Sequence, residues 1–392
     1  MPAKEQQFAE HEAALEKRSG AGRARRIMFV IEALTVGGAE RMIVDLANEF
    51  SRRGDQITVV CLSSRGELAD ALSADVKLHV LNKKPGADLS IVKPLRALID
   101  LEQVDVVNSH LWTANLWTRL SLIGRNVPVV VTEHNRDVWK NSHNRFIDRI
   151  LSRRTQKLIA VSNDTASFYT DDVGIRNSIV CVVNNGVDTQ RYSSGSGARL
   201  RTLLADGSDF LIGTVGRLTE QKNHARLVCC AALLKSRGLS FKVVIAGDGP
   251  ERDRTQRCIE ENNVSDCVTL LGERSDIPDL LAALDVFVLS SDREGHPLSA
   301  LEAQAAGTPV VLTNAGGSAD AIAESGTDTG GVLVEKSSES LADALMDLAQ
   351  DESKLKSMSQ FASEYALANF DRQTMINNYG EIFDSVIDPD RA

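Results

Sequence analysis

Residues 290–303 read SSDREGHPLSALEA and follow directly on the apolar run Val286–Leu289. A run of this length suits a buried strand, and Pro297 suits the first turn of a helix. The stretch therefore predicts a strand, a loop that carries Glu294, and a helix whose second turn carries Glu302. Strand, loop and helix in this order form the repeating unit of a parallel sheet covered by helices.

The same alternation of short apolar runs and amphipathic stretches extends along the chain. Further strands are expected at Arg26–Ile31, Ile57–Leu62, Val76–Leu81, Val104–Asn108, Val127–Thr132, Lys157–Val161, Ile179–Val183, Phe210–Val215, Phe241–Ala246, Cys267–Leu271, Pro309–Leu312 and Val332–Val334. Three helices are expected at the end, over Ser340–Gln350, Glu352–Asn369 and Arg372–Ile387. The Gly/Ser-rich stretch Val187–Asp209 interrupts the series and is typical of a linker. The sequence predicts an α/β protein of two Rossmann-like halves, with ligands at the carboxyl ends of strands.

The length and the net charge of the chain narrow the classes of protein to which it can belong. Its 392 residues are too many for one compact core, and we expect a flexible charged tail (1–25), two domains (26–190 and 191–370) and a C-terminal helix (371–392). A net charge of −10 argues against a general binder of nucleic acid or another polyanion. No stretch reaches the roughly 18 continuous apolar residues that a membrane-spanning helix needs.

The charge is unevenly divided between the two halves of the chain, and the cysteines indicate a reducing compartment. Residues 1–190 carry a net charge of +2 and residues 191–392 one of −12, so the two halves present different surfaces. The six cysteines show no C-x-x-C spacing, which is typical of buried thiols in a reducing compartment. They are Cys61, Cys181, Cys229, Cys230, Cys258 and Cys267. We therefore expect a cytoplasmic protein.

Two of the expected strands are followed by features that suit phosphate groups. Gly37 and Gly38 open a helix, where backbone N–H groups and the helix dipole favour an anion; a tight turn is the alternative. In the second half a strand ends at Gly216, and Arg217 and Lys222 follow at the mouth of a helix. A planar guanidinium and a point-charge ammonium together suit a diphosphate.

Glu294 and Glu302 are placed to border one ligand. Ionised carboxylates accept strong hydrogen bonds from the hydroxyl groups of a polyol such as a sugar. The backbone N–H groups of Leu298 and its neighbours have no partner within the helix, so they suit a phosphate group. This loop and helix start therefore predict a site that holds both a sugar and a phosphate.

Four motifs in series carry a resemblance to a known family. They are V-G-G-A-E at 36–40, G-R-L-x-x-Q-K-N at 216–223, G-D-G-P at 247–250 and E-G-H-P-L-x-x-L-E-A-x-A-x-G-T-P-V-V at 294–311. With these motifs the chain from Arg26 to Ile387 resembles the retaining glycosyltransferases of family 4. The resemblance implies a GT-B fold: an acceptor domain (26–190) and a donor domain (191–370) face each other across a cleft, and the last helix crosses back to the first domain.

The resemblance also implies roles for single residues. Arg217 and Lys222 would hold the nucleotide diphosphate and stabilise its growing charge, while Glu302 would bind the ribose and Glu294 the donor sugar. His134, which follows an expected strand, would lie near that sugar; a structural loop histidine is the alternative. The remaining ligand-binding residues would be Gly37, Gly38, Gly216, Gly295, His296, Pro297, Leu298 and Ser299. His296 and Gln304 depart from the family pattern, which commonly has a hydrophobic residue and Met there.

The reaction that the resemblance implies is transfer of a hexosyl group with retention of configuration. The donor would be a nucleotide diphosphate sugar, UDP before GDP, and the acceptor a glycan or lipid-linked saccharide of polysaccharide or cell-envelope biosynthesis. Family members generally need no metal, and the sequence has no D-x-D motif at a strand end and no clustered His/Cys ligands, so we expect no cofactor. A nucleotide-sugar 2-epimerase of the same fold and a non-catalytic nucleotide-sugar-binding protein are the alternatives.

Residues 136–157 suggest a contact with a membrane. The stretch holds seven basic and two acidic side chains, and Phe146, Ile147, Ile150 and Leu151 recur at helical spacing. A basic amphipathic helix can rest on anionic lipid, which would place the protein at the inner face of the cell membrane. An ordinary solvated helix with a core face is the alternative.

Overall fold

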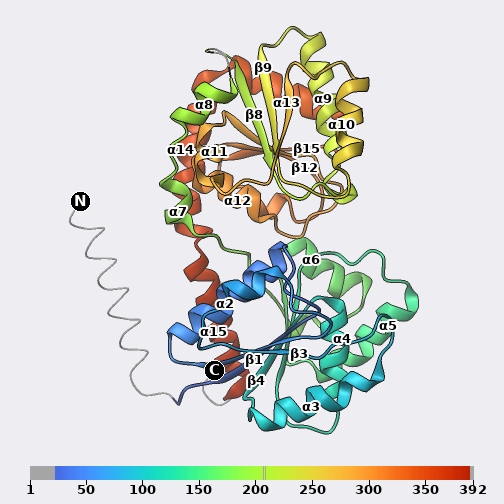
Figure 1. Cartoon of the computed structure of the whole chain (residues 1–392). Coiled ribbons are helices and arrows are strands. Elements are labelled where there is room, and N and C mark those ends of the chain that lie inside the picture. Colours follow the sequence, from blue (N-terminus) through green and yellow to red (C-terminus); the bar gives the residue numbers. More distant parts are fainter. Residues whose placement is uncertain (1–22, 206, 208, 389–392) are drawn as a thin grey trace, which may run out of the picture. The chain divides into compact units, whose positions relative to one another are not determined.

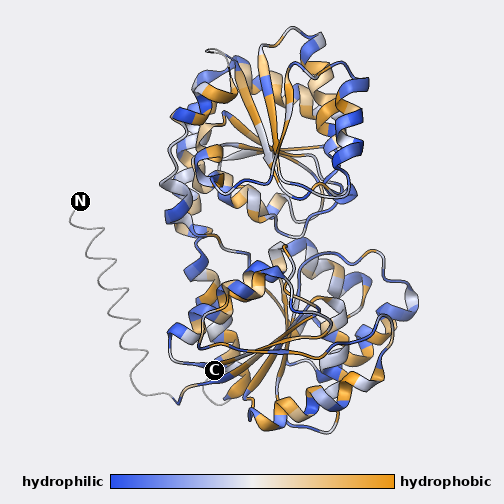
Figure 2. Ribbon diagram, in the orientation of Figure 1, coloured by the Kyte–Doolittle hydropathy of each residue, from blue (hydrophilic) through white to orange (hydrophobic). Residues whose placement is uncertain are grey.

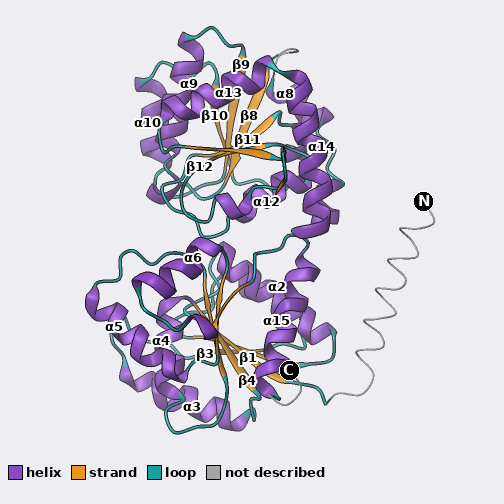
Figure 3. Cartoon of the chain, turned by 180° about the vertical axis from the view of Figure 1, so that it is seen from behind, coloured by secondary structure: helices purple, strands orange, loops and turns teal. Residues whose placement is uncertain are grey.

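The computed structural model describes residues 23–388 except Asp206 and Ser208, and almost all of the predicted tail lies outside this part of the chain (Figure 1). It contains two parallel sheets, each covered by helices (Figure 3). The chain forms two compact units. The first holds the residues up to Thr132, Leu151–Lys157 and those from Phe383, and the second holds Glu133–Ile150 and Leu158–Ile382. The domain boundary expected near residue 190 stays a prediction.

The first sheet has seven strands in the order β3-β2-β1-β4-β5-β6-β7. Their bounds are β1 (Arg26–Ile31), β2 (Gln56–Cys61), β3 (Lys77–Val80), β4 (Val106–His110), β5 (Val129–Glu133), β6 (Lys157–Ala160) and β7 (Val180–Val182). Every strand expected in this half is present, within two residues of its expected ends. Most residues of these strands are apolar, as the orange in Figure 2 shows, because a parallel sheet is covered on both faces, whereas β4 and β5 end in polar residues.

The second sheet has six strands in the order β10-β9-β8-β11-β12-β15. Their bounds are β8 (Phe210–Val215), β9 (Phe241–Ala246), β10 (Val268–Gly272), β11 (Val286–Leu289), β12 (Val310–Thr313) and β15 (Gly331–Val334). A short antiparallel pair, β13 (Glu324–Ser325) and β14 (Asp328–Thr329), was not expected, since its residues are polar and mostly exposed. The strand order places β8 at the centre, beside β11.

Helices connect the strands of both sheets. They are α2 (Gly38–Arg52), α3 (Val92–Leu101), α4 (Leu111–Ser121), α5 (Ser142–Leu151), α6 (Asn163–Ser167), α7 (Thr189–Ser193), α8 (Ala198–Leu204), α9 (His224–Ser236), α10 (Arg252–Glu261), α11 (Ile277–Ala283), α12 (Leu298–Ala305), α13 (Ser338–Gln350), α14 (Glu352–Asn369) and α15 (Arg372–Ile387). The three closing helices are confirmed. The first of them begins two residues earlier than expected because the Ser337 hydroxyl caps it, accepting from the Ser340 N–H at 3.0 Å.

The expected linker is wrong as a description of Val187–Asp209, because this stretch contains α7 and α8. Tyr192 and Leu200 are buried in the core of the second sheet. A Cβ at Gly195 or Gly197 would overlap backbone oxygens of the neighbouring α11. The glycines therefore permit close packing here, whereas the sequence suggested flexibility.

The last helix returns to the first unit, as the resemblance implied. From Phe383 onward, α15 belongs to that unit. The Phe383 ring lies 6.2 Å from that of Phe29 in β1 and 5.6 Å from that of Phe50 in α2. These aromatic contacts in the core hold the end of α15 beside the first sheet.

The six cysteines are all free. Cys61, Cys230 and Cys267 are buried, but Cys181, Cys229 and Cys258 are only half-buried. The expectation of six buried thiols is therefore wrong for these three, because each keeps part of its surface exposed to solvent. Among the described residues, no helix is long and apolar enough to cross a membrane.

Candidate active site

The candidate site lies in the second unit, where the central strands β8 and β11 end. Hydrogen bonds join the loops that follow these two strands. The Asp292 N–H donates to the carbonyl of Gln221 at 2.8 Å, and the Gln221 side chain donates to the carbonyl of Arg293 at 2.7 Å. The Ser290 hydroxyl donates to the Asn223 carbonyl at 2.9 Å. The two motifs that carry the predicted cations and carboxylate thus form one rigid edge.

Lys222 and Glu294 meet at this edge. The Lys222 ammonium donates to Glu294 Oε1 at 2.7 Å, and the Ser291 hydroxyl donates to the same oxygen at 2.5 Å. Glu294 is 7% exposed, whereas Lys222 is half-buried. A charge-assisted pair that is partly screened from water is short and well oriented. The structure therefore brings together the group expected to hold a diphosphate and the group expected to hold a sugar.

Arg217 follows Gly216 at the end of β8 and is exposed. Within the described part of the chain, its guanidinium makes no hydrogen bond or ion pair. Lys222 stands in a short 3-10 turn that ends at Asn223, whose φ of 45° lies in the left-handed region that asparagine tolerates. The side chain of Asn223 then caps α9, accepting from the Arg226 N–H at 3.3 Å. This turn therefore fixes the backbone position from which the Lys222 side chain extends.

The start of α12 follows Glu294 directly. Pro297 is its N-cap, and no side chain caps the helix. Among the described residues, the N–H groups of Leu298 and Ser299 have no backbone partner, so the positive end of the helix dipole is open to an anion. Glu302 lies in the second turn of α12, as predicted, and its Oε1 accepts from the Tyr192 hydroxyl at 2.7 Å.

His134 directly follows β5 and packs against the Glu294 loop through backbone atoms. A Cβ at Gly295 would overlap the carbonyl oxygen of His134, and one at Gly317 would overlap the carbonyl oxygen of Gly295. Burial lowers the pKa of His134 to about 3, so its imidazole is neutral at pH 7. The main chain of His134 therefore lies against the Glu294 loop, and Gly295 and Gly317 make this approach possible.

Gly295→Ala should reduce turnover by about 100-fold, because the new methyl group pushes the His134 and Glu294 loops apart by about 1 Å. The expected loss in free energy of unfolding is about 1–3 kcal/mol. Steady-state kinetics and urea unfolding measure the two effects. Gly124→Ala is the control: its φ is 82° but a Cβ there meets nothing, so it should lose some stability and keep full turnover. Full turnover in Gly295→Ala would contradict the assignment.

His296 is buried and neutral. Its Nε2 lies 3.1 Å from the carbonyl oxygen of Asp320 and 3.0 Å from Nδ2 of Asn184, and its ring packs edge-on to Phe370. Burial lowers its pKa to about 4. The side chain of His296 therefore supports the loop.

Gln304 has a structural contact as well. Its buried side-chain amide donates to the Ala321 carbonyl at 2.6 Å and accepts from the Ala323 N–H at 2.7 Å. These bonds tie α12 to the chain that follows β12. The departure from Met at this position thus has an explanation in the fold.

Gly37 and Gly38 lie in the first unit, unlike the other predicted site residues. Gly38 begins α2, and Gly37 is its N-cap. The carboxylate of Glu40 in the first turn closes over Gly37, so a Cβ there would overlap it. An acidic side chain thus already faces the positive end of this helix, and the anion-binding role of the two glycines stays a prediction.

The sequence missed several polar residues that the fold gathers here. Asn185 Nδ2 donates to the His296 carbonyl at 2.8 Å. Asp164 Oδ2 is buried without a hydrogen-bond partner among the described residues, close to Gly316. Burial raises the pKa of Asp164, while Arg136 opposes this rise. Asn185 and Asp164 each follow a strand of the first sheet, and this position was the only signal that could have found them.

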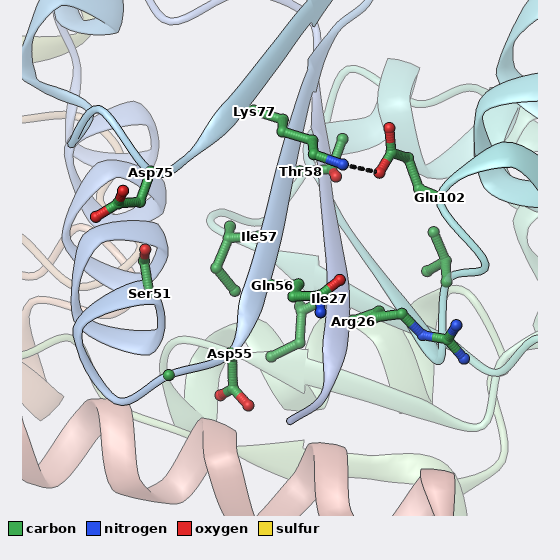
Figure 4. A pocket seen from close by; sticks show the side chains of 12 residues that line it. Arg26, Ile27, Ser51, Asp55, Gln56, Ile57, Thr58, Asp75, Lys77 and Glu102 are labelled. Atoms are coloured by element: carbon green, nitrogen blue, oxygen red, sulfur yellow. Dashed lines mark hydrogen bonds and ion pairs between the residues drawn. The ribbon is translucent and has the colours of Figure 1, made fainter. Parts of the chain in front are cut away.

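One hollow of the first unit lies away from this site. It has a volume of about 290 Å³ and lies in the first unit, lined by Arg26, Ile27, Ser51, Gly54, Asp55, Gln56, Ile57, Thr58, Asp75, Lys77, Glu102 and Val104 (Figure 4). Arg26, Gln56 and Lys77 begin their strands. The hollow therefore sits at the amino ends of the strands, opposite the edge where α/β sheets bind ligands. Its Lys77 is paired with Glu102 at 2.5 Å.

Two parallel sheets of this kind define the GT-B class, and solved structures agree. The chain superimposes on the Anabaena protein Alr3699/HepE, solved in complex with UDP, with a TM-score of 0.81 and 22% identity; 92% of this chain and 100% of that chain are covered. A likeness at this identity shows the fold.

Two protein-family models match the sequence of this chain. Residues 36–191 match the model described as Glycosyltransferase Family 4, and residues 200–365 match that of Glycosyl transferases group 1. Between them the two models span most of the chain, which therefore belongs to the family 4 glycosyltransferases.

Two curated relatives come from bacteria. A putative glycosyltransferase, EpsF of Bacillus subtilis (strain 168), is 28% identical over 74% of this chain and 79% of its own length. The Escherichia coli UDP-Gal:alpha-D-GlcNAc-diphosphoundecaprenol alpha-1,3-galactosyltransferase is 26% identical over 72% of this chain and 77% of its own length.

Proposed function

We propose that this glycosyltransferase moves a hexosyl group from a UDP-sugar to a hydroxyl group of a glycan or lipid-linked saccharide. The observation that carries the proposal is the Lys222–Glu294 pair, 2.7 Å apart beside the open start of α12. An ammonium and free N–H groups suit a diphosphate, and a carboxylate suits sugar hydroxyls. The Anabaena protein that shares this fold was solved with UDP and with UDP-glucose.

In the proposed reaction, the bond between the anomeric carbon and the diphosphate oxygen breaks, and its electron pair leaves with UDP. The acceptor oxygen attacks from the same face, so the configuration is retained, and its proton passes to the leaving phosphate. Lys222 and Arg217 stabilise the charge that grows on the diphosphate. No side chain is assigned as a nucleophile, and independence from metal is part of the proposal.

The relatives support the proposed acceptor and its setting. The E. coli relative is named for an acceptor linked to diphosphoundecaprenol, and this supports a lipid-linked saccharide in cell-envelope or polysaccharide synthesis. The free cysteines favour a cytoplasmic location.

A thermal-shift screen of UDP- and GDP-sugars tests the donor, because a ligand of the native state raises Tm. The protein is then incubated with the best donor and without an acceptor. Slow hydrolysis that Glu294→Ala abolishes supports the transferase. A changed sugar on an intact nucleotide indicates a 2-epimerase, and binding without any turnover, with or without saccharide acceptors, indicates a non-catalytic binding protein.

A further inference from the structure

The exposed face of α5 carries large apolar side chains. Phe146 is 60% exposed and Ile150 is 43% exposed. They stand four positions apart and so share one face of the helix. Of the other two apolar residues at helical spacing, Leu151 is buried and Ile147 is half-buried. This helix therefore presents two large apolar side chains, Phe146 and Ile150, to the solvent.

The loop before α5 adds two more apolar side chains. Val138 is 46% exposed and Trp139 is 52% exposed. The loop is fixed to α5 because Lys140 donates to Asp148 at 2.7 Å and Arg145 donates to the Lys140 carbonyl at 3.1 Å. We call Val138, Trp139, Phe146, Arg149 and Ile150 the α5 surface.

The acidic side chains of residues 136–157 do not face the solvent with the basic ones. Asp137 and Asp148 both pair with the ammonium of Lys140, at 3.0 Å and 2.7 Å. Lys140 itself is buried, so it adds nothing to the surface charge. Arg149, Arg153 and Arg154 are all exposed. The charges that this stretch presents to water are therefore mostly basic.

We propose that the α5 surface docks on an anionic lipid bilayer. An interfacial helix needs apolar side chains that enter the boundary between headgroups and acyl chains, and cations that meet the anionic headgroups. Tryptophan is enriched at this depth of a membrane. The α5 surface and the arginines that follow it in the chain supply all three features. The proposal is independent of the reaction proposed above.

The test is flotation of the full-length protein with vesicles of phosphatidylcholine, with and without phosphatidylglycerol. We expect binding only where phosphatidylglycerol is present, with a blue shift of tryptophan fluorescence that Trp139→Phe abolishes. The double variant Phe146→Ser/Ile150→Ser should weaken binding by roughly tenfold or more. The triple variant Arg149→Gln/Arg153→Gln/Arg154→Gln should lose about fivefold for each arginine.

Two control variants match these changes elsewhere on the protein. Leu367→Ser removes an exposed apolar side chain from α14, and Arg257→Gln removes an exposed cation from α10. Both should bind vesicles as the parent does, and every variant should keep the parent's UDP-sugar thermal shift. Equal binding to both vesicles, or unchanged binding in the double and triple variants, overturns the proposal. So does capture of a protein partner by this surface without any binding to vesicles.

Discussion

Lys222→Ala is expected to lower kcat by about 100- to 1,000-fold, the usual cost of removing one group that stabilises charge in a transition state. The Lys222 ammonium is half-buried and lies 2.7 Å from the carboxylate of Glu294, the residue expected to bind the sugar. Without it, the diphosphate would leave with its growing charge less well neutralised. Initial rates of transfer, or of slow donor hydrolysis, measure the effect.

Lys235→Ala is the matched control for Lys222→Ala. Lys235 lies in the last turn of α9 and pairs with Asp266 on the surface, so its loss should leave turnover unchanged. Lys222→Arg keeps the charge and should recover part of the rate. If Lys222→Ala binds and turns over the donor as well as the parent, the diphosphate assignment is wrong.

Lys140→Met is expected to reduce the free energy of unfolding by about 3–5 kcal/mol, because it leaves buried carboxylates without their cation. The Lys140 side chain is fully buried, and its ammonium lies 3.0 Å from Asp137, 2.7 Å from Asp148 and 3.9 Å from Glu133. The Tyr169 hydroxyl accepts from it at 2.9 Å. Burial lowers the pKa of Lys140, but the carboxylates raise it more, so the ammonium stays charged.

Urea unfolding at neutral pH measures this loss. The control is Lys356→Met, which breaks an exposed pair with Glu352 on α14 and should change little. Asp148→Asn removes one of three carboxylates and should cost less than Lys140→Met. An unfolding midpoint of Lys140→Met equal to that of the parent would contradict the role of Lys140 as the centre of this cluster.

The strands of this protein could be predicted closely from the sequence. β1, β8, β9 and β11 have the bounds expected from their apolar runs. Burial on both faces makes each of them a largely apolar segment, which is a local signal. The order of the strands and the edge that binds ligands then follow from general rules of parallel sheets.

The contacts of the site could not be predicted in the same way. Lys222 and Glu294 were each expected near the ligand, but their pairing joins positions 72 residues apart. Asp164 and Asn185 belong to none of the sequence motifs. Only the tertiary fold brings them close to the other residues of the site. The prediction of a linker was wrong for a related reason. The sequence alone does not show whether a glycine permits close packing or makes the chain flexible.

The contact of His134 with Gly295, and of Gly295 with Gly317, is made by main-chain atoms. The side chain at position 134 therefore does not set the spacing of these loops, whereas the side chain of His296 supports its own loop through Asp320 and Asn184. A designer could vary position 134 to change which sugar is accepted, provided that His296 and the two glycines are kept. A focused library at position 134 would then explore sugar selectivity with little risk to the spacing of the loops.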